Sequence, residues 1–501
     1  MIADASFPET IPALLGWRAS GADASKPWLF FEGETWSLSD VLSEIDRYAV
    51  GLAERGVVHG DRVAIMLGNR PQTLFAWFAA NHLGAIAMPL NLAYKAPELA
   101  GLLAVVAPRL LVVDVEAESP AHALALAACQ ALEAGKRPEL VAPGALARSG
   151  AGAPSVVVVP DDVAVLLATS GTTGAPKAVM QTHRTYTLTA EAFPWWTGLT
   201  AEDRLLVALP LFHINAQAYS VMGALGSGGS LALMPRFSAS RFWEQAKTLG
   251  ATQFNAVGAI VNILLGTEPK ASDRAHGLRL CYAALALPEE RHRAFEERFG
   301  LAMTVGYGLS ETTFGTVWPR GVPPRYGTMG TLRQHPRLGA ISRARVVTDD
   351  GRDAEDGEAG EMWLDSPAMM RGYWPDADRA PGWFHTGDLV RRDGEGFYTF
   401  VARKKEVLRR RGENVAAVEI ENVLAAHPSV AEAAVVGVPA ALGEDDIVAY
   451  VVAAKGVAVD VEALREWTRA RLADFKVPSQ IHLRDALPRT ATERVAKHLL
   501  K

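Results

Sequence analysis

The chain has 501 residues, more than one ordinary hydrophobic core holds, so two or three packed units are expected. Its 50 basic and 56 acidic side chains leave a formal net charge of −6, which argues against nucleic acid or an acidic membrane as the main partner. The two cysteines, Cys129 and Cys281, lack metal-type or redox-type spacing, and no apolar run approaches the roughly 20 residues that span a bilayer. These features favour a globular cytoplasmic protein that handles a small molecule.

The first hundred residues alternate between helical and strand-like patterns. Apolar spacing predicts helices over residues 39–55 and 74–83, and apolar runs predict strands over 61–67, 85–90 and 110–114. Such alternation is typical of an α/β architecture with largely buried sheets. Residues 116–154 are rich in Ala, Gly and Pro and lose clear periodicity, so an irregular excursion is expected there.

The pattern changes again near residues 401–403. A Gly-rich stretch at 393–398 gives way to a basic run and then to a new alternation of helices and strands. This change predicts a large domain of residues 1–402 and a small C-terminal domain of residues 403–501. A short polar junction of this kind permits rigid-body rotation of one domain against the other.

The strongest local signal is the loop Thr169-Ser-Gly-Thr-Thr-Gly-Ala-Pro-Lys177, which follows an apolar strand. Glycines expose backbone amides, and with Ser and Thr hydroxyls and one lysine such a loop can surround a phosphate. It is not a Walker loop, because the spacing that places Gly-Lys-Ser/Thr at a helix start is absent. Read alone, it could also be an ordinary Gly/Thr loop.

This loop resembles the phosphate loop of the adenylate-forming superfamily, which includes acyl-CoA synthetases, luciferases and peptide-synthetase adenylation domains. Further segments resemble that family's pattern in the same order: Pro210-Leu-Phe-His213, Tyr307-Gly-Leu-Ser-Glu-Thr312, Gly360-Glu-Met, Arg371-Gly-Tyr-Trp374, Gly382-Trp-Phe-His-Thr-Gly-Asp388, Arg403-Lys-Lys-Glu406, Gly412-Glu-Asn414 and Pro488-Arg-Thr490. The resemblance covers residues 35–501. It implies an α/β fold with a large N-terminal domain of several subdomains, in which helices flank stacked β-sheets beside a distorted β-barrel, and a small mobile α+β lid.

The resemblance also implies an acyl-CoA ligase, which converts a carboxylic acid through acyl-AMP to acyl-CoA with ATP or acyl-AMP, Mg²⁺ and coenzyme A. The implied site residues are Lys177, His213, Glu311 and Arg494 for catalysis; Thr169, Ser170, Gly171, Thr172, Thr173, Gly174, Ala283, Ala284, Gly306, Tyr307, Gly308, Ser310, Thr312, Asp388, Phe400 and Arg403 for the nucleotide; Thr169 and Glu311 for the metal; Phe254, Val257 and Gly258 for the acyl pocket; Lys405 for the hinge; and Arg411, Gly412 and Glu413 for coenzyme A.

These residue types suit that chemistry. The carboxylate of Asp388 can accept two hydrogen bonds from a vicinal diol, and Glu311 can hold Mg²⁺ against phosphates. Taken singly, either residue would more often be a surface carboxylate or a helix cap. The basic run at 404–405 and 409–411 has two equal readings, a solvated face or a contact with coenzyme A phosphates.

The chain departs from the family pattern at its C-terminal tip. The family reads Pro-x-Thr-x-x-Gly-Lys, and its lysine bridges the substrate carboxylate and the α-phosphate, whereas this chain has Glu493 and Arg494 in place of glycine and lysine. A planar guanidinium does not replace a compact ammonium where geometry is tight. One hypothesis is that acyl transfer to coenzyme A is retained while adenylation is weak or lost, so that a separate adenylating ligase supplies acyl-AMP. The alternative is that Arg494, or Lys497, does the work of the lysine.

Small residues in the implied acyl pocket (Gly258, Ala283, Ala284 and Gly306) predict a bulky, hydrophobic acid rather than acetate. Two other functions are kept open: a carrier-protein-loading or luciferase-like enzyme with the same adenylate site, and a non-catalytic nucleotide-binding protein. We expect a monomer or a homodimer.

Overall fold

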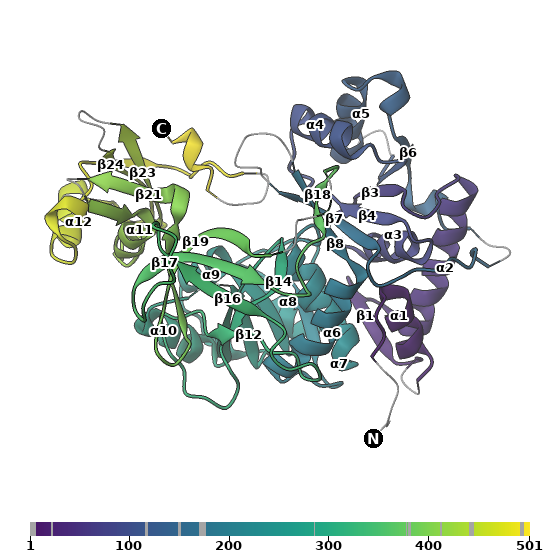
Figure 1. Cartoon of the computed structure of the whole chain (residues 1–501), viewed down its shortest axis with the longest axis horizontal. Coiled ribbons are helices and arrows are strands. Elements are labelled where there is room, and N and C mark those ends of the chain that lie inside the picture. The colour runs from purple at the N-terminus through teal and green to yellow at the C-terminus, as the bar shows by residue number, and fades with distance from the viewer. Residues whose placement is uncertain are drawn as a thin grey trace.

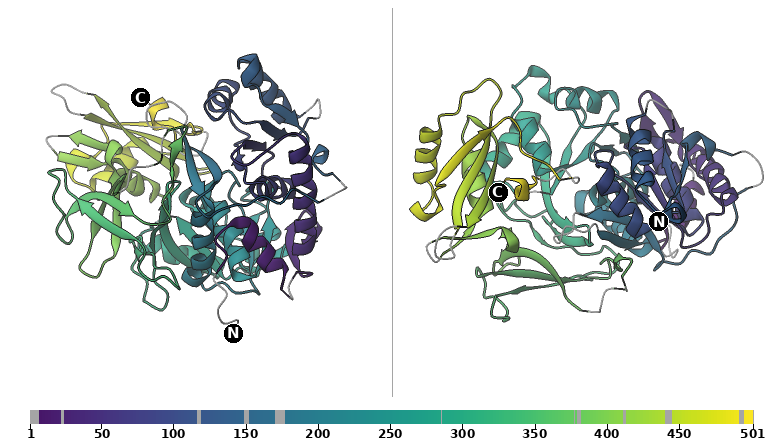
Figure 2. Two further views of the ribbon diagram at one scale, coloured as in Figure 1. Left: turned by 45° about the vertical axis from the view of Figure 1, so that its right-hand side comes forward. Right: turned by 90° about the horizontal axis from the view of Figure 1, so that it is seen from above.

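A computed structural model describes residues 7–21, 24–115, 119–148, 152–169, 177–284, 286–376, 378, 382–410, 413–439, 445–490 and 495–500. Figure 1 shows a large body that carries most of the chain and a small C-terminal domain at one end, in yellow-green. The two views of Figure 2 show the same arrangement. The predicted fold class, a large α/β domain followed by a small C-terminal domain, is confirmed.

Two large sheets form the centre of the large domain. The seven-stranded sheet has the order β18-β8-β7-β4-β3-β5-β6, with bounds Gly372–Trp374, Lys177–Thr182, Val163–Thr169, Ile86–Pro89, Arg62–Met66, Leu110–Val113 and Glu139–Val141. The nine-stranded sheet has the order β15-β14-β13-β12-β11-β9-β10-β1-β2, with bounds Thr331–Leu332, Thr312–Val317, Ala302–Leu309, Leu280–Ala284, Gln253–Val257, Arg204–Val207, Ser230–Leu233, Pro27–Phe31 and Glu34–Ser37. Strands β9 to β13 run parallel to one another.

Helices cover both faces of these sheets. They are α1 (Ile11–Ala19), α2 (Leu38–Glu54), α3 (Pro71–His82), α4 (Ala96–Val106), α5 (Pro120–Gln130), α6 (His183–Thr197), α7 (Met222–Ser227), α8 (Phe242–Thr248), α9 (Gly258–Leu265) and α10 (Glu289–Phe299), with a π-helix, η3 (Asn215–Val221), ahead of α7. Strand β3 shows why both faces of the seven-stranded sheet are apolar. Its Val63 and Ile65 join the core with α2 and α3, whereas Ala64 and Met66 join the core with α4 and α5.

The remaining strands form smaller sheets. Where a distorted barrel was expected, the described strands β16 (Arg343–Val347), β17 (Ala359–Asp365), β19 (Phe384–Arg392) and β20 (Tyr398–Arg403) make a four-stranded antiparallel sheet. The C-terminal domain contains η5 (Lys404–Glu406), β21 (Val407–Arg410), β22 (Glu413–Ala416), α11 (Ala417–Ala425), β23 (Val430–Pro439), β24 (Asp445–Ala453), α12 (Val461–Arg469), β25 (Gln480–Arg484) and η8 (Lys497–Leu499). Its apolar clusters contain only residues from Leu408 onward.

One sequence prediction of structure is wrong. Residues 116–154 were expected to be irregular, but their described part contains α5 and the edge strand β6. Ala125, Ala128 and Cys129 share one buried face of α5, so small side chains supply an apolar stripe that composition alone conceals. Among the described residues, no helix is both long and apolar enough to cross a membrane.

Candidate active site

Strands β7 and β8 hold the two ends of the predicted phosphate loop. They pair antiparallel, and Thr169 at the end of β7 lies opposite Lys177 at the start of β8. The predicted nucleotide contacts Ser170, Gly171, Thr172, Thr173 and Gly174 lie outside the described residues. The described geometry therefore places a hydroxyl and an ammonium on either side of the loop's base.

The turn that carries Glu311 lies between β13 and β14. The Tyr373 hydroxyl donates a hydrogen bond of 2.9 Å to Glu311 Oε1, and Lys177 Nζ lies 5.2 Å from the centroid of the Tyr373 ring. Tyr373 thus contacts both the predicted metal ligand and the predicted phosphate lysine. Sequence reasoning did not select it, although the motif Arg371-Gly-Tyr-Trp374 contains it.

The metal prediction fits these residues. Within the described parts of the chain, no group of three or more His, Cys, Asp or Glu side chains could hold a metal ion by itself. Mg²⁺ usually binds through one or two carboxylates together with substrate phosphates and water. A half-buried Glu311 beside the phosphate-loop strands provides one such carboxylate.

The buried carboxylate of Asp388 lies in β19, opposite Arg403 of β20. Asp388 Oδ1 pairs with Arg403 Nε at 2.7 Å, and Asp388 Oδ2 accepts a hydrogen bond of 2.5 Å from the Tyr307 hydroxyl. Burial and the neighbouring Asp388 raise the pKa of Tyr307 well above its usual value, so this hydroxyl keeps its proton. The structure therefore brings three predicted nucleotide residues together and engages both carboxylate oxygens.

The other described residues predicted to bind the nucleotide lie on or between β12, β13, β14 and β20. Gly306 and Gly308 lie in β13 with Tyr307, Ser310 and Thr312 flank Glu311, Ala283 and Ala284 end β12, and Phe400 lies in β20. The Ser310 carbonyl accepts a hydrogen bond of 2.5 Å from the side chain of Gln181 in β8. This bond links the Glu311 turn to the strand that follows the phosphate loop.

The residues predicted for the acyl pocket have different environments. Val257 ends β11 and is 36% exposed, and the half-exposed Gly258 begins α9. Phe254 instead lies in the core, where its ring centroid is 4.9 Å from that of Phe242 in α8. His213 is half-buried just before the π-helix η3, with its ring 4.3 Å from that of Phe212. A π-helix is rare and is often found at functional sites.

A buried arginine fills the space beside Gly306, and sequence reasoning did not predict it. Arg333 is 1% exposed and donates hydrogen bonds to the Thr316 carbonyl at 3.0 Å and to the hydroxyls of Tyr219 and Tyr282. A Cβ atom on Gly306 would lie 2.3 Å from the Tyr282 hydroxyl and 2.8 Å from an Arg333 nitrogen. The glycine is therefore needed for close packing here and leaves no room for a substrate.

Several of the residues predicted for the C-terminal domain cannot be placed. Arg411, Gly412 and Arg494 lie outside the described residues, as does the side chain of Glu413. Lys405 is exposed in η5.

Lys497, the alternative to the missing lysine, is already engaged. Its ammonium lies 2.6 Å from Glu406 Oε2 and 2.8 Å from Glu421 Oε1, and the side chain is 21% exposed. Both partners belong to the C-terminal domain, so these ion pairs hold the tail against η5 and α11.

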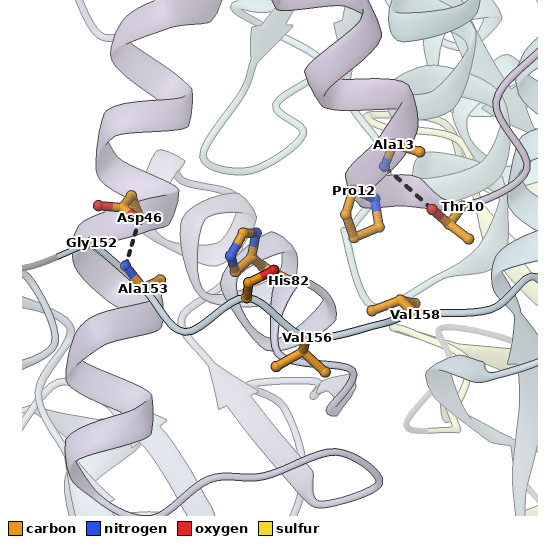
Figure 3. A pocket seen from close by; sticks show the side chains of 10 residues that line it. Thr10, Pro12, Ala13, Asp46, His82, Gly152, Ala153, Val156 and Val158 are labelled. Carbon is orange, nitrogen blue, oxygen red and sulfur yellow. Dashed lines mark hydrogen bonds between the residues drawn. The ribbon is translucent and has the colours of Figure 1, made fainter.

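One cavity lies elsewhere in the large domain. It has a volume of about 380 Å³ and is lined by α1, α2, α3 and the segment 152–158. Figure 3 shows its two hydrogen bonds, from the Ala13 amide to Thr10 and from the Ala153 amide to Asp46. Its lining contains none of the predicted site residues.

Comparisons with known proteins place the chain in a family. The model "AMP-binding enzyme" matches residues 17–374, and the model "AMP-binding enzyme C-terminal domain" matches residues 419–494. Crotonobetaine/carnitine–CoA ligase of Salmonella arizonae is 32% identical, over 96% of this chain and 97% of its own.

Two solved structures share the fold. ATP-bound MatB from Rhodopseudomonas palustris is 27% identical over 98% of each chain, with a TM-score of 0.85. O-succinylbenzoate coenzyme A synthetase from Bacillus subtilis, solved with ATP and a magnesium ion, is 26% identical over 97% of this chain and 98% of its own, with a TM-score of 0.82. Because the matches extend over both domains and include a ligase at 32% identity, the chain belongs to the adenylate-forming superfamily, as an AMP-forming acyl-CoA synthetase.

Proposed function

We propose that this synthetase transfers acyl groups from acyl-AMP to coenzyme A and has a weak or absent adenylation step. The observation that carries the proposal is the pair Glu493 and Arg494, which stands where the family has glycine and lysine. The ion pairs of Lys497 with Glu406 and Glu421 support it, because a lysine held by two carboxylates is not available to bridge a substrate carboxylate and a phosphate. In the retained step the thiolate sulfur attacks the acyl carbon, a carbon–sulfur bond forms, and the carbon–oxygen bond to phosphate breaks, which releases AMP.

The proposed roles of the residues follow from their positions. Lys177 and the loop before it neutralise phosphate charge, and Glu311 with Thr169 holds Mg²⁺, which supplies further charge neutralisation when bound. Asp388 binds the ribose hydroxyls, with Arg403 beside it. His213 gates the acyl pocket ahead of η3. The B. subtilis neighbour was solved with ATP and a magnesium ion, which supports the binding of these two ligands by the shared fold.

The proposed acid is bulky and hydrophobic. Support comes from the half-exposed Gly258 and the more exposed Val257 and Ala284 at the ends of neighbouring strands, where an acyl group can approach. Gly306 gives no support, because Tyr282 and Arg333 fill the space beside it. The name of the S. arizonae relative points to a second candidate class, acids such as crotonobetaine and carnitine.

We also propose that residues 1–402 and 403–501 are the two domains and that Lys405 lies at their hinge. Arg411, Gly412 and Glu413 would then contact coenzyme A when the C-terminal domain turns. The alternative for this basic run, a solvated face, predicts that replacing Arg411 by Ala leaves the Michaelis constant for coenzyme A unchanged.

The test compares two assays of the purified full-length protein. One supplies a panel of acids with ATP, Mg²⁺ and coenzyme A, and the other supplies preformed acyl-AMP and coenzyme A. We expect acyl-CoA only, or at least 100-fold faster, in the second assay. Equal rates would overturn the proposed loss of adenylation, and no product in either assay would overturn the ligase function.

A designed variant makes the test sharper. Restoring the family residues with the double change Glu493→Gly and Arg494→Lys should raise acid-dependent exchange of pyrophosphate into ATP by tenfold or more, as a compact ammonium regains its position. The same variant should keep its rate with acyl-AMP. An unchanged exchange rate would show that the tip residues do not limit adenylation.

A further inference from the structure

The segment 369–374 joins the two large sheets at the candidate site. Met369 forms a bridge with Thr312, and the Met370 amide donates a hydrogen bond of 2.7 Å to the Glu311 carbonyl. A few residues later, β18 pairs with β8, with Tyr373 opposite Val179 and Trp374 opposite Ala178. The backbone of one short segment therefore ties the Glu311 turn of the nine-stranded sheet to the strand that begins with Lys177.

Tyr373 makes the same link with its side chain. Its hydroxyl donates to Glu311 Oε1 at 2.9 Å, and its ring centroid lies 5.2 Å from Lys177 Nζ.

We infer that Tyr373 is a positioning residue, which orients Glu311 toward Mg²⁺ and places Lys177 for the phosphates. A hydrogen bond to Oε1 restricts rotation of the carboxylate and leaves Oε2 to face the metal. Carboxylates that bind metals are commonly held in this way, and loss of the holding group typically weakens metal binding by about 10- to 100-fold. The ring face attracts the ammonium and so favours one place for it. The inference rests on the roles proposed above for Glu311 and Lys177.

The neighbouring Trp374 provides a matched control. Its indole Nε1 donates a hydrogen bond of 3.2 Å to the Val105 carbonyl in α4, and its ring lies 5.3 Å from the guanidinium carbon of Arg62. Trp374 therefore fastens β18 to α4 and β3, and these contacts differ from those of Tyr373 with Glu311 and Lys177. A purely structural role for this strand would make changes at Trp374 and Tyr373 equivalent.

The experiment is a calorimetric titration of the full-length protein with ATP, without metal and with saturating Mg²⁺. The dissociation constant for ATP without metal, divided by the constant with Mg²⁺, measures the coupling of metal to nucleotide. For Tyr373→Phe, which keeps the ring, we expect this ratio to fall about tenfold while metal-free ATP binds as in the wild type. For Tyr373→Leu, which also loses the ring face, we expect metal-free binding to weaken by roughly two- to tenfold in addition. Trp374→Phe should change neither quantity.

Four results would overturn the inference. An unchanged coupling ratio in Tyr373→Phe would mean that the hydroxyl does not orient Glu311, and a larger ratio would mean that it competes with the metal for the carboxylate. A wild-type protein whose ATP affinity ignores Mg²⁺ would overturn the assignment of Glu311 itself, and with it this inference, before any variant is compared. An equal decrease of the coupling ratio in Tyr373→Phe and Trp374→Phe would show that Tyr373 has only a structural role.

Discussion

His183 shows at the scale of one residue how burial makes a titratable group pH-sensitive. It begins α6, is fully buried, and accepts a hydrogen bond of 3.3 Å from the Ile11 amide at Nδ1. Burial lowers its pKa to about 4 from the usual value of about 6.5, because the charged imidazolium is poorly solvated there. The folded state therefore holds a neutral ring over a pH range in which the unfolded chain takes up a proton.

The expected result is a loss of stability in acid. Above pH 6.5, His183 should have no effect on the free energy of unfolding. As the pH falls from 6.5 to 4, the free energy of unfolding should decrease progressively, by about 3 kcal/mol in total, because the unfolded chain binds a proton that the folded protein does not. His183→Asn keeps an acceptor for the Ile11 amide and should remove this part of the pH dependence. Urea titrations at successive pH values measure the slope of the unfolding free energy against pH. The exposed His498, changed to Asn, should leave the slope unchanged. Identical slopes for wild type and His183→Asn would contradict the prediction.

Tyr307 and Asp388 lead to a prediction about nucleotide binding. In this structure the Tyr307 hydroxyl occupies Asp388 Oδ2, an oxygen that a ribose diol would need. Tyr307→Phe keeps the ring and removes this competitor, so AMP should bind several-fold more tightly, up to about tenfold, since the net contribution of one hydrogen bond is about 0.5–1.5 kcal/mol. Titration calorimetry with AMP measures the change. Weaker binding would show that the hydroxyl contacts the nucleotide directly.

At the scale of elements, the sequence predicted helices and strands correctly where the apolar spacing and capping residues lie within the segment itself. The helix expected over 39–55 is α2, which begins with a capping box between Ser37 and Asp40, and the strand expected over 61–67 contains β3. Helix α5 was missed because alanines replace large apolar residues on its buried face. Tyr373 and Arg333 were missed for another reason, since their partners lie far away in the sequence and only the folded chain brings them together.

The contact between α6 and α7 depends on a glycine. A Cβ atom added to Gly226 would lie 1.7 Å from the Ala190 carbonyl oxygen, which is backbone and cannot move away alone. Gly226→Ala should therefore destabilise the large domain by about 1–3 kcal/mol or more, as overpacking does. Gly16→Ala in α1 is the matched control, because nothing lies within 4 Å of its added Cβ, and it should stabilise by about 0.5–1 kcal/mol. Urea denaturation measures both, and equal effects would contradict the argument.

At the scale of the whole molecule, the apolar clusters divide the chain. Those of the large domain end before residue 403, and those of the C-terminal domain begin at Leu408. Without a shared core, cooperativity should not extend across the junction. Scanning calorimetry should show two transitions, and AMP should raise the temperature of the one with the larger enthalpy, which belongs to the larger domain. One transition whose calorimetric and van't Hoff enthalpies agree would refute this division.

Arg291 links the large domain to the C-terminal domain through its side chain, and this contact affects how fast the two domains can separate. Its guanidinium donates a hydrogen bond of 3.0 Å to the Ala425 carbonyl at the end of α11 and another of 3.0 Å to Asn262 in the large domain. A charged donor at a helix C-terminus contributes about 1.5–3 kcal/mol, which corresponds to a preference of roughly 10- to 150-fold for the docked arrangement. If the C-terminal domain turns during each cycle, as proposed above, this contact must break each time, so Arg291 would slow the departure from this arrangement.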